Sequence, residues 1–262
     1  GHIGNIIGFI FVTGAFFVFS LLGFKRSDIF PFKTIFAAAV ALIIAALTLV
    51  LALGESRLKP QRRRFYFSKK FFKYYMLEVF YGARKQIFLT FAPYVLILRY
   101  GASTSIISLL LAICAAFGII FSPLTGKLID RVGYKFIMVT DTLLLMAVCF
   151  FYGFAHRIFS PGTAFIVVCV NYVLDSIISL ASMASNVYVQ DIASSQEEIT
   201  ATLSTGVSVN HVISILIALL GGWIWKTVGI EVLFSLSAFL GLLNTLYAAT
   251  IKKPEKSGLL RP

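Results

Sequence analysis

Charged residues are scarce in this chain of 262 residues, at 13% of the total, whereas hydrophobic residues reach 59%. A soluble domain carries about 25% charged residues, so the composition excludes an ordinary soluble protein. The mean hydropathy of +0.91 agrees with this. The apolar residues form stretches of about 20 or more, and each is long enough as a helix to cross a hydrocarbon layer of about 30 Å.

Short segments of alternating polarity, the pattern of a membrane β-barrel, are also missing. The sequence therefore predicts an all-α membrane protein, a polytopic bundle of helices. Eight spans are expected, near residues 3–23, 32–54, 74–98, 103–122, 135–155, 162–187, 203–225 and 229–250.

Cysteines and histidines number only three each, and neither forms a ligand-like or disulfide pattern. Cys114, Cys149 and Cys169 all fall inside expected spans. No nucleophile elbow, zinc-protease motif or Walker loop is present. The sequence thus predicts no enzyme, no cofactor and no metal site, and without a Walker loop an ion gradient is the simpler energy source.

Basic residues are unevenly distributed between the two sides of the membrane. One side carries the clusters at 57–73, 127–135 and 252–261, and the other carries Lys25, Arg26, Lys33, Arg99, Arg157 and Lys226. By the positive-inside rule the first side, with the C-terminus, is cytoplasmic, as expected for a cell (inner) membrane protein. The net charge of +12 therefore reflects topology and contact with anionic lipids, and it predicts no nucleic-acid binding.

The first methionine, Met76, lies inside the third expected span, and no start residue precedes the first two. The chain is therefore expected to be an N-terminally truncated fragment of a longer protein.

A charged motif, Gly-Lys-Leu-Ile-Asp-Arg-Val-Gly-Tyr-Lys, occupies residues 126–135 between the fourth and fifth spans. It resembles the cytoplasmic loop signature of the major facilitator superfamily (MFS). The segment 189–211 also looks like the penultimate cytoplasmic loop and following helix of bacterial members, although it lacks Lys and Arg. The resemblance covers the whole chain. It implies a conformational latch built from Gly126, Asp130, Arg131, Gly133 and Lys135; a loop that only orients the helices is the alternative.

The same resemblance implies a domain organisation. Residues 1–54 would be the last two helices of an N-terminal bundle, 55–73 the basic cytoplasmic loop between bundles, 74–251 a six-helix C-terminal bundle, and 252–262 a cytoplasmic tail. About eight of twelve spans would then be present.

Ionisable residues within spans are costly and therefore indicate a cavity or a partner. Asn171, Asp175, Ser179, Ser182 and Asn186 recur at helical spacing and predict one polar stripe. The stripe either lines a substrate path or forms hydrogen bonds between helices.

Arg84, Lys85 and Gln86 lie in the third span, where consecutive residues point about 100° apart. Arg84 is expected either to bind an anionic substrate or to pair with Asp175, while Lys85 either faces the path or snorkels to the interface. Asn210 and His211 lie in the seventh span. His211 is a candidate for proton coupling, with packing as its alternative.

The predicted function is secondary active transport of a small solute by alternating access, as a symporter or antiporter with the proton as the expected coupling ion. A polar or anionic solute is favoured over a drug-like one. The alternatives are a channel, a lipid-moving protein and a non-transporting membrane scaffold.

Overall fold

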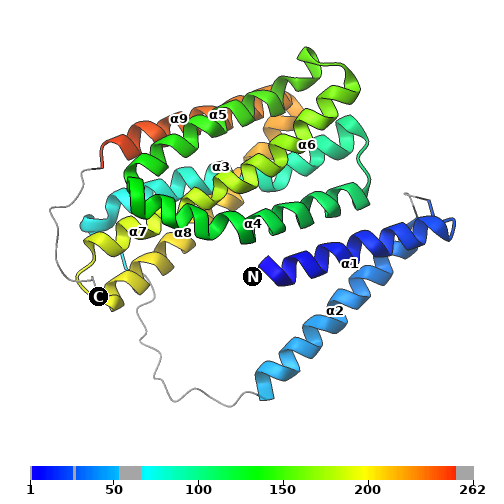
Figure 1. Ribbon diagram of the computed structural model, residues 1–262, viewed down its shortest axis with the longest axis horizontal. Coiled ribbons are helices and arrows are strands. Elements are labelled where there is room, and N and C mark those ends of the chain that lie inside the picture. Colours follow the sequence, from blue (N-terminus) through cyan, green and yellow to red (C-terminus); the bar gives the residue numbers. More distant parts are fainter. Residues whose placement is uncertain (1, 26–27, 53–65, 252–262) are drawn as a thin grey trace.

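The computed structural model describes residues 2–25, 28–52 and 66–251. Within these ranges the chain is helical and contains no strand (Figure 1). The elements are α1 (His2–Leu21), α2 (Ile29–Ala52), the 3₁₀ turn η1 (Lys69–Phe71), α3 (Phe72–Tyr100), α4 (Thr104–Val132), α5 (Tyr134–Ile158), α6 (Pro161–Ile178), the 3₁₀ turn η2 (Ser179–Ser182), α7 (Met183–Ile192), α8 (Gln196–Thr227) and α9 (Ile230–Ala249).

Seven spans are long and apolar enough to cross a membrane, with Pro161–Ile192 counted as one. The predicted all-α polytopic bundle is confirmed. The remaining expected span, the third, corresponds to α3 and does not reach the same apolarity, because it carries Glu78, Arg84 and Lys85 in its middle. Its 29 residues nevertheless extend about 43 Å, which is long enough to cross the bilayer beside its neighbours.

Helices α3 to α9 form one bundle with α3 near its centre (Figure 1). The main helix pairs are α5 with α9, α3 with α8, α5 with α6, and α3 with α9. The start of α3, the α4–α5 connection, the α7–α8 connection and the end of α9 lie at one end of the bundle. By the positive-inside assignment this end is the predicted cytoplasmic side.

The interior contains two apolar clusters at different depths. One includes α3 residues Ile87 to Leu96, and the other includes Phe71 to Leu77. The charged residues of α3 lie between them. The fold therefore places a polar layer across the middle of an apolar bundle.

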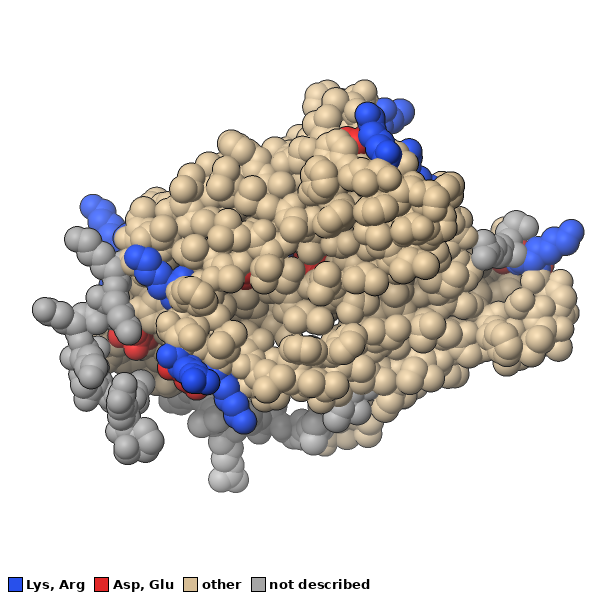
Figure 2. All heavy atoms as spheres, turned by 45° about the horizontal axis from the view of Figure 1, so that its top comes forward, with Lys and Arg blue, Asp and Glu red and all other residues tan. Residues whose placement is uncertain are grey.

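The first two helices lie beside this bundle. Helix α1 packs along α4, whereas almost all described side chains of α2 are exposed. Lys and Arg gather at the two ends of the visible face, and the band between them is almost uncharged (Figure 2). This distribution matches a surface that faces lipid.

Two local expectations from the sequence were wrong. The spans expected at 103–122 and 135–155 leave residues 123–134 as their connection, but α4 continues to Val132 and Gly133 alone joins it to α5. Gly133 has φ 89°, which glycine adopts without the steric cost that other residues incur. The second difference concerns span six, which is not one continuous helix, because η2 interrupts it at Ser179–Ser182.

The inter-bundle loop expected at 55–73 is described only from Tyr66 onward, and the tail expected at 252–262 lies outside the described residues.

Candidate substrate path

Arg84 lies inside the polar layer and is only 3% exposed. Its Nη1 is 3.5 Å from Oδ2 of Asp141 on α5, and its Cζ lies 5.2 Å from the ring centroid of Tyr81. Of the two roles expected for Arg84, the resting ion pair is formed with Asp141 rather than with Asp175. Among described atoms, Arg84 Nε and Nη1 find no hydrogen-bond acceptor within bonding geometry. The ion pair is therefore a long one, and two nitrogens of Arg84 remain available as hydrogen-bond donors.

A second buried carboxylate, Glu78, joins three helices one to two turns from Arg84. Ser185 Oγ on α7 donates to its Oε1 at 3.2 Å, and Asn210 Nδ2 on α8 donates to its Oε2 at 3.1 Å. Within the described part of the chain, Glu78 has no ion-pair partner within 4.0 Å. The predicted path residue Asn210 thus holds a carboxylate on α3.

Lys85, the next residue of α3, lines a cavity of about 170 Å³ between α3, α4 and α6. The opposite charge, Asp175 on α6, lines the same cavity, together with Phe88, Leu89, Leu111, Cys114, Tyr172, Ser176 and Ser179. We call this space the charged cavity. Lys85 lies near the middle of α3, and Asp175 lies near the middle of the span Pro161–Ile192, so the cavity lies near mid-membrane depth.

Tyr81 and η2 separate the charged cavity from a smaller polar cavity of about 20 Å³. The small cavity lies nearer the predicted cytoplasmic end and is bordered by Glu78, Asp141, Ser182, Ser185 and Asn244, among others. The Tyr81 hydroxyl donates to the carbonyl oxygen of Ser179 at 3.3 Å. This hydrogen bond links a residue that lines the small cavity to a residue that lines the charged cavity.

Three other predicted path residues do not line the charged cavity. Gln86 donates to Thr90 Oγ1 at 2.6 Å along α3, and Asn171 is buried and donates to the Val167 carbonyl at 2.8 Å. His211 is exposed on α8, directly after the buried Asn210. The predicted polar stripe is divided in the same way, with Asp175 and Ser179 on the charged cavity and Ser182 on the small one.

The predicted latch residues lie at the α4–α5 junction. Asp130, Arg131 and Lys135 are exposed, and in the part of the chain that the structure describes none of them forms an ion pair or a side-chain hydrogen bond. Gly126 lies within α4 rather than in a loop. Their charges are therefore presented outward at the end of the bundle.

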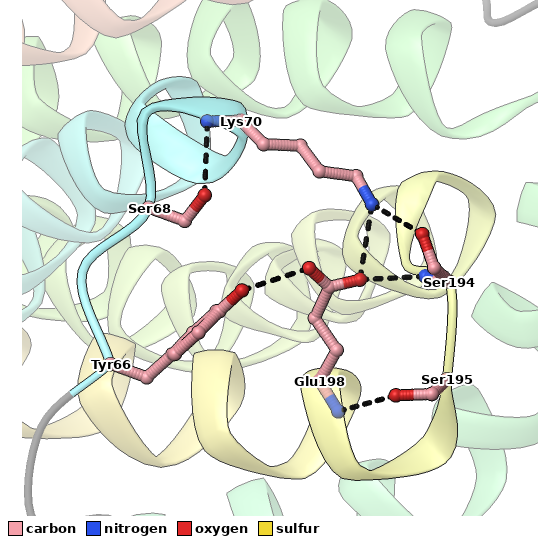
Figure 3. Close-up of polar contacts among 6 residues, drawn as sticks. All are labelled: Tyr66, Ser68, Lys70, Ser194, Ser195 and Glu198. Carbon is pink, nitrogen blue, oxygen red and sulfur yellow. Dashed lines mark hydrogen bonds and ion pairs between the residues drawn. The ribbon is translucent and has the colours of Figure 1, made fainter.

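The end of the inter-bundle loop is fastened to the bundle at Glu198, the third residue of α8 (Figure 3). Tyr66 Oη donates to Glu198 Oε1 at 2.9 Å, and Lys70 Nζ approaches Oε2 at 3.0 Å. The Ser194 amide also donates to Oε2 at 2.7 Å, and Ser195 Oγ caps α8 through the Glu198 amide at 3.2 Å. We call these five residues the Glu198 cluster.

Several residues at the two cavities were not predicted from the sequence, because the pattern around them is weak or absent. Tyr81, Lys85 and Phe88 share a face of α3 at spacings of four and three, which is the helical signal of a common surface. Cys114 and Tyr172 give no such signal, because their position depends on how α4 and α6 pack against α3.

The fold and these buried charges define a multi-pass helical membrane protein with a charged cavity inside the bundle. Residues 74–261 match the Major Facilitator Superfamily model, and the chain belongs to this family of membrane transporters for small molecules. No curated protein and no solved structure gives a significant match.

Proposed function

We propose that the protein is a secondary active transporter that moves a small solute by alternating access through the charged cavity. The observation that carries this is the pair Lys85 and Asp175, opposite charges that line one cavity near mid-membrane depth. Ionisable groups at that depth are costly and normally mark a substrate or ion pathway. The two bundles would rock about the cavity, with the α4–α5 junction as a latch.

Proton coupling is part of the proposal. Glu78 and Asp141 border the small cavity on the predicted cytoplasmic side of Tyr81. A buried carboxylate that accepts only neutral donors, as Glu78 does from Ser185 and Asn210, gains from binding a proton. Protons would therefore be exchanged next to the solute cavity. His211, exposed on α8, is less suited to this role.

The test is counterflow in proteoliposomes with protein expressed from its complete reading frame. Vesicles are loaded with one unlabelled solute from a panel of amino acids, dicarboxylates, sugars and lipophilic cations, and uptake of the labelled solute is followed with and without an imposed pH gradient. A carrier gives saturable uptake with a transient overshoot. Uptake that is linear in concentration and without overshoot would instead identify a channel.

A lipid-moving protein and a membrane scaffold are the remaining alternatives. Transfer of labelled phospholipid between leaflets with no counterflow would favour the first. Absence of both activities would favour the scaffold, for which charges at Lys85 and Asp175 inside membrane spans have no use.

The proposal places the protein in the cell membrane with its C-terminus in the cytoplasm, in accordance with the distribution of Lys and Arg. We also propose that α3 to α9 form the C-terminal bundle, and that α1 and α2 belong to the other half and meet it through the α1–α4 contact.

A further inference from the structure

The charged cavity presents one positive and one negative group that are not paired with each other. Among described residues, Lys85 and Asp175 form no ion pair within 4.0 Å. Lys85 Nζ instead lies 5.8 Å from the ring centroid of Tyr81. Lys85 is exposed toward the cavity and Asp175 lies half-buried beside it, so both charges are open to partners that a solute supplies. The empty volume between them is where those partners fit.

We propose that the substrate is a small zwitterion, a solute with one carboxylate and one ammonium group and the size of an amino acid. This inference rests on the proposed function and names its substrate class. The solute's carboxylate faces Lys85 and its ammonium faces Asp175, so both charges of the cavity are neutralised at once. A solute of one charge neutralises one of them and brings the other no partner.

The size and the remaining lining support the same class. The cavity of about 170 Å³ is smaller than the range of roughly 300–1,000 Å³ typical of sites for drug-sized ligands. Phe88, Leu89 and Leu111 provide an apolar wall, whereas Ser176 and Ser179 lie with Asp175 along one side of the α6–η2 segment. An amino acid with a short apolar side chain matches this division of the cavity into an apolar wall and a polar side.

Arg84 explains why a simple anion fits less well. Arg84 is the stronger anion-binding group, because its guanidinium can bind a carboxylate through two hydrogen bonds. It is held beside Asp141 and does not line the charged cavity. The cavity is therefore balanced, with one cation and one anion, rather than positive.

The experiment compares matched solutes that differ only in charge: leucine, leucine amide and N-acetyl-leucine, with a parallel set built on alanine. Binding to purified protein is followed by thermal shift and by displacement of labelled leucine, and transport is followed by counterflow. We expect at least one zwitterion to bind about tenfold or more tightly than both of its singly charged analogues.

The variants Lys85→Gln and Asp175→Asn give the readout that a purely structural role would not produce. Lys85→Gln is expected to weaken binding of the zwitterion about tenfold and leave leucine amide unaffected. Asp175→Asn is expected to weaken the zwitterion similarly and leave N-acetyl-leucine unaffected. Lys226→Gln, an exposed lysine at the far end of α8, is the matched control and should bind like the unmodified protein.

The two proposals fail separately. The substrate class is wrong if a singly charged analogue binds as tightly as its zwitterion. It is also wrong if neither the leucine nor the alanine set binds and an anion or a lipophilic cation does. In both cases the proposal that the protein is a carrier is unaffected. Zwitterion binding without counterflow supports the substrate class and overturns the carrier.

Discussion

Lys70 and Glu198 are 128 positions apart in the chain, yet their side chains meet at 3.0 Å and join the end of the inter-bundle loop to the start of α8. The pair is partly exposed, and pairs of this kind contribute about 0.2–1 kcal/mol each. Its effect is therefore expected on the local position of the loop rather than on overall stability.

Lys70→Gln and Glu198→Gln should both increase hydrogen exchange of the backbone amides at Tyr66–Lys70, because the loop end loses its ionic contact. The melting temperature should change by no more than a few degrees. Lys69→Gln, on the adjacent exposed lysine, is the matched control. Equal exchange in the Lys69 and Lys70 variants would show that the loop is held by other contacts, such as that of the Tyr66 amide with Thr205.

The Arg84–Asp141 pair leads to a stability prediction. Arg84→Gln leaves the Asp141 carboxylate buried without its cation, which costs about 3–5 kcal/mol. Asp141→Asn likewise leaves the Arg84 guanidinium buried without its counter-charge. The double variant removes both charges, so it should melt closer to the unmodified protein than either single variant does. Thermal unfolding in detergent is the measurement.

Lys85→Gln, one residue along α3, serves as the control for that cycle, because Lys85 is exposed to the charged cavity and should alter the melting temperature little. Strictly additive effects of Arg84→Gln and Asp141→Asn would mean that the two side chains do not interact in the folded bundle.

Helices α3 and α8 approach closely at Gly82, where an added Cβ would lie 2.9 Å from the backbone oxygen of Asn210. Backbone cannot move aside as a flexible side chain can. Gly82→Ala should therefore destabilise the bundle by about 1–3 kcal/mol. It should also disturb the hydrogen bond from Asn210 to Glu78.

Gly222→Ala on α8 is the matched control for Gly82→Ala, since nothing lies within 4 Å of its added Cβ. It should be neutral or slightly stabilising, because alanine favours a helix by about 1 kcal/mol over glycine. If Gly82→Ala melts at the same temperature as Gly222→Ala, the close approach of α3 and α8 is not present in the membrane.

Tyr81→Phe removes the hydroxyl that donates to the Ser179 carbonyl but keeps the ring beside Arg84 and Lys85. If this hydrogen bond holds the interval between the two cavities closed, its loss should speed solute release toward the predicted cytoplasmic side. Binding affinity should change less than twofold, while the counterflow rate changes several-fold. An unaltered rate would show that Tyr81 does not control passage.

Glu78→Gln tests the coupling proposal. Glutamine keeps one oxygen that can accept from Ser185, and its amide group can donate to Asn210 Oδ1 once the Asn210 amide turns over, but it cannot carry a proton. Solute exchange should therefore persist while uphill uptake driven by a pH gradient is lost. Proton movement is followed with a trapped pH dye. Full gradient-driven uptake in Glu78→Gln would remove Glu78 from the coupling mechanism.

The helical fold could be predicted from the sequence because span length and apolarity are properties of single segments. The partners of the buried charges could not. Spacing along α3 places Arg84 and Lys85 about 100° apart, but which of them meets Asp141 and which meets the cavity depends on the rotation of α3 within the bundle. Asp175 was one of two alternatives offered for Arg84, and the ion pair that the structure contains is with Asp141 instead.

The length of α4 was underestimated for a related reason. Gly126, Lys127, Asp130 and Arg131 have the polarity of a loop, and polarity is the signal by which a span is taken to end. The helix nevertheless continues through them to Val132, since hydrogen bonds along its axis need no apolar surroundings. The interruption at η2 gave no signal either, because Ser179 and Ser182 continue the helical spacing.

The single residue Gly133 leaves no slack between α4 and α5. With about 43 Å of helix on one side of this joint, a tilt of about 5° there swings the far end of α4 by about 4 Å. Cys114, on the wall of the charged cavity, lies about 27 Å along the same arm and moves by about 2 Å. In the proposed alternating-access cycle, the α4–α5 hairpin would act as a lever, through which a small displacement at its joint changes the width of the charged cavity.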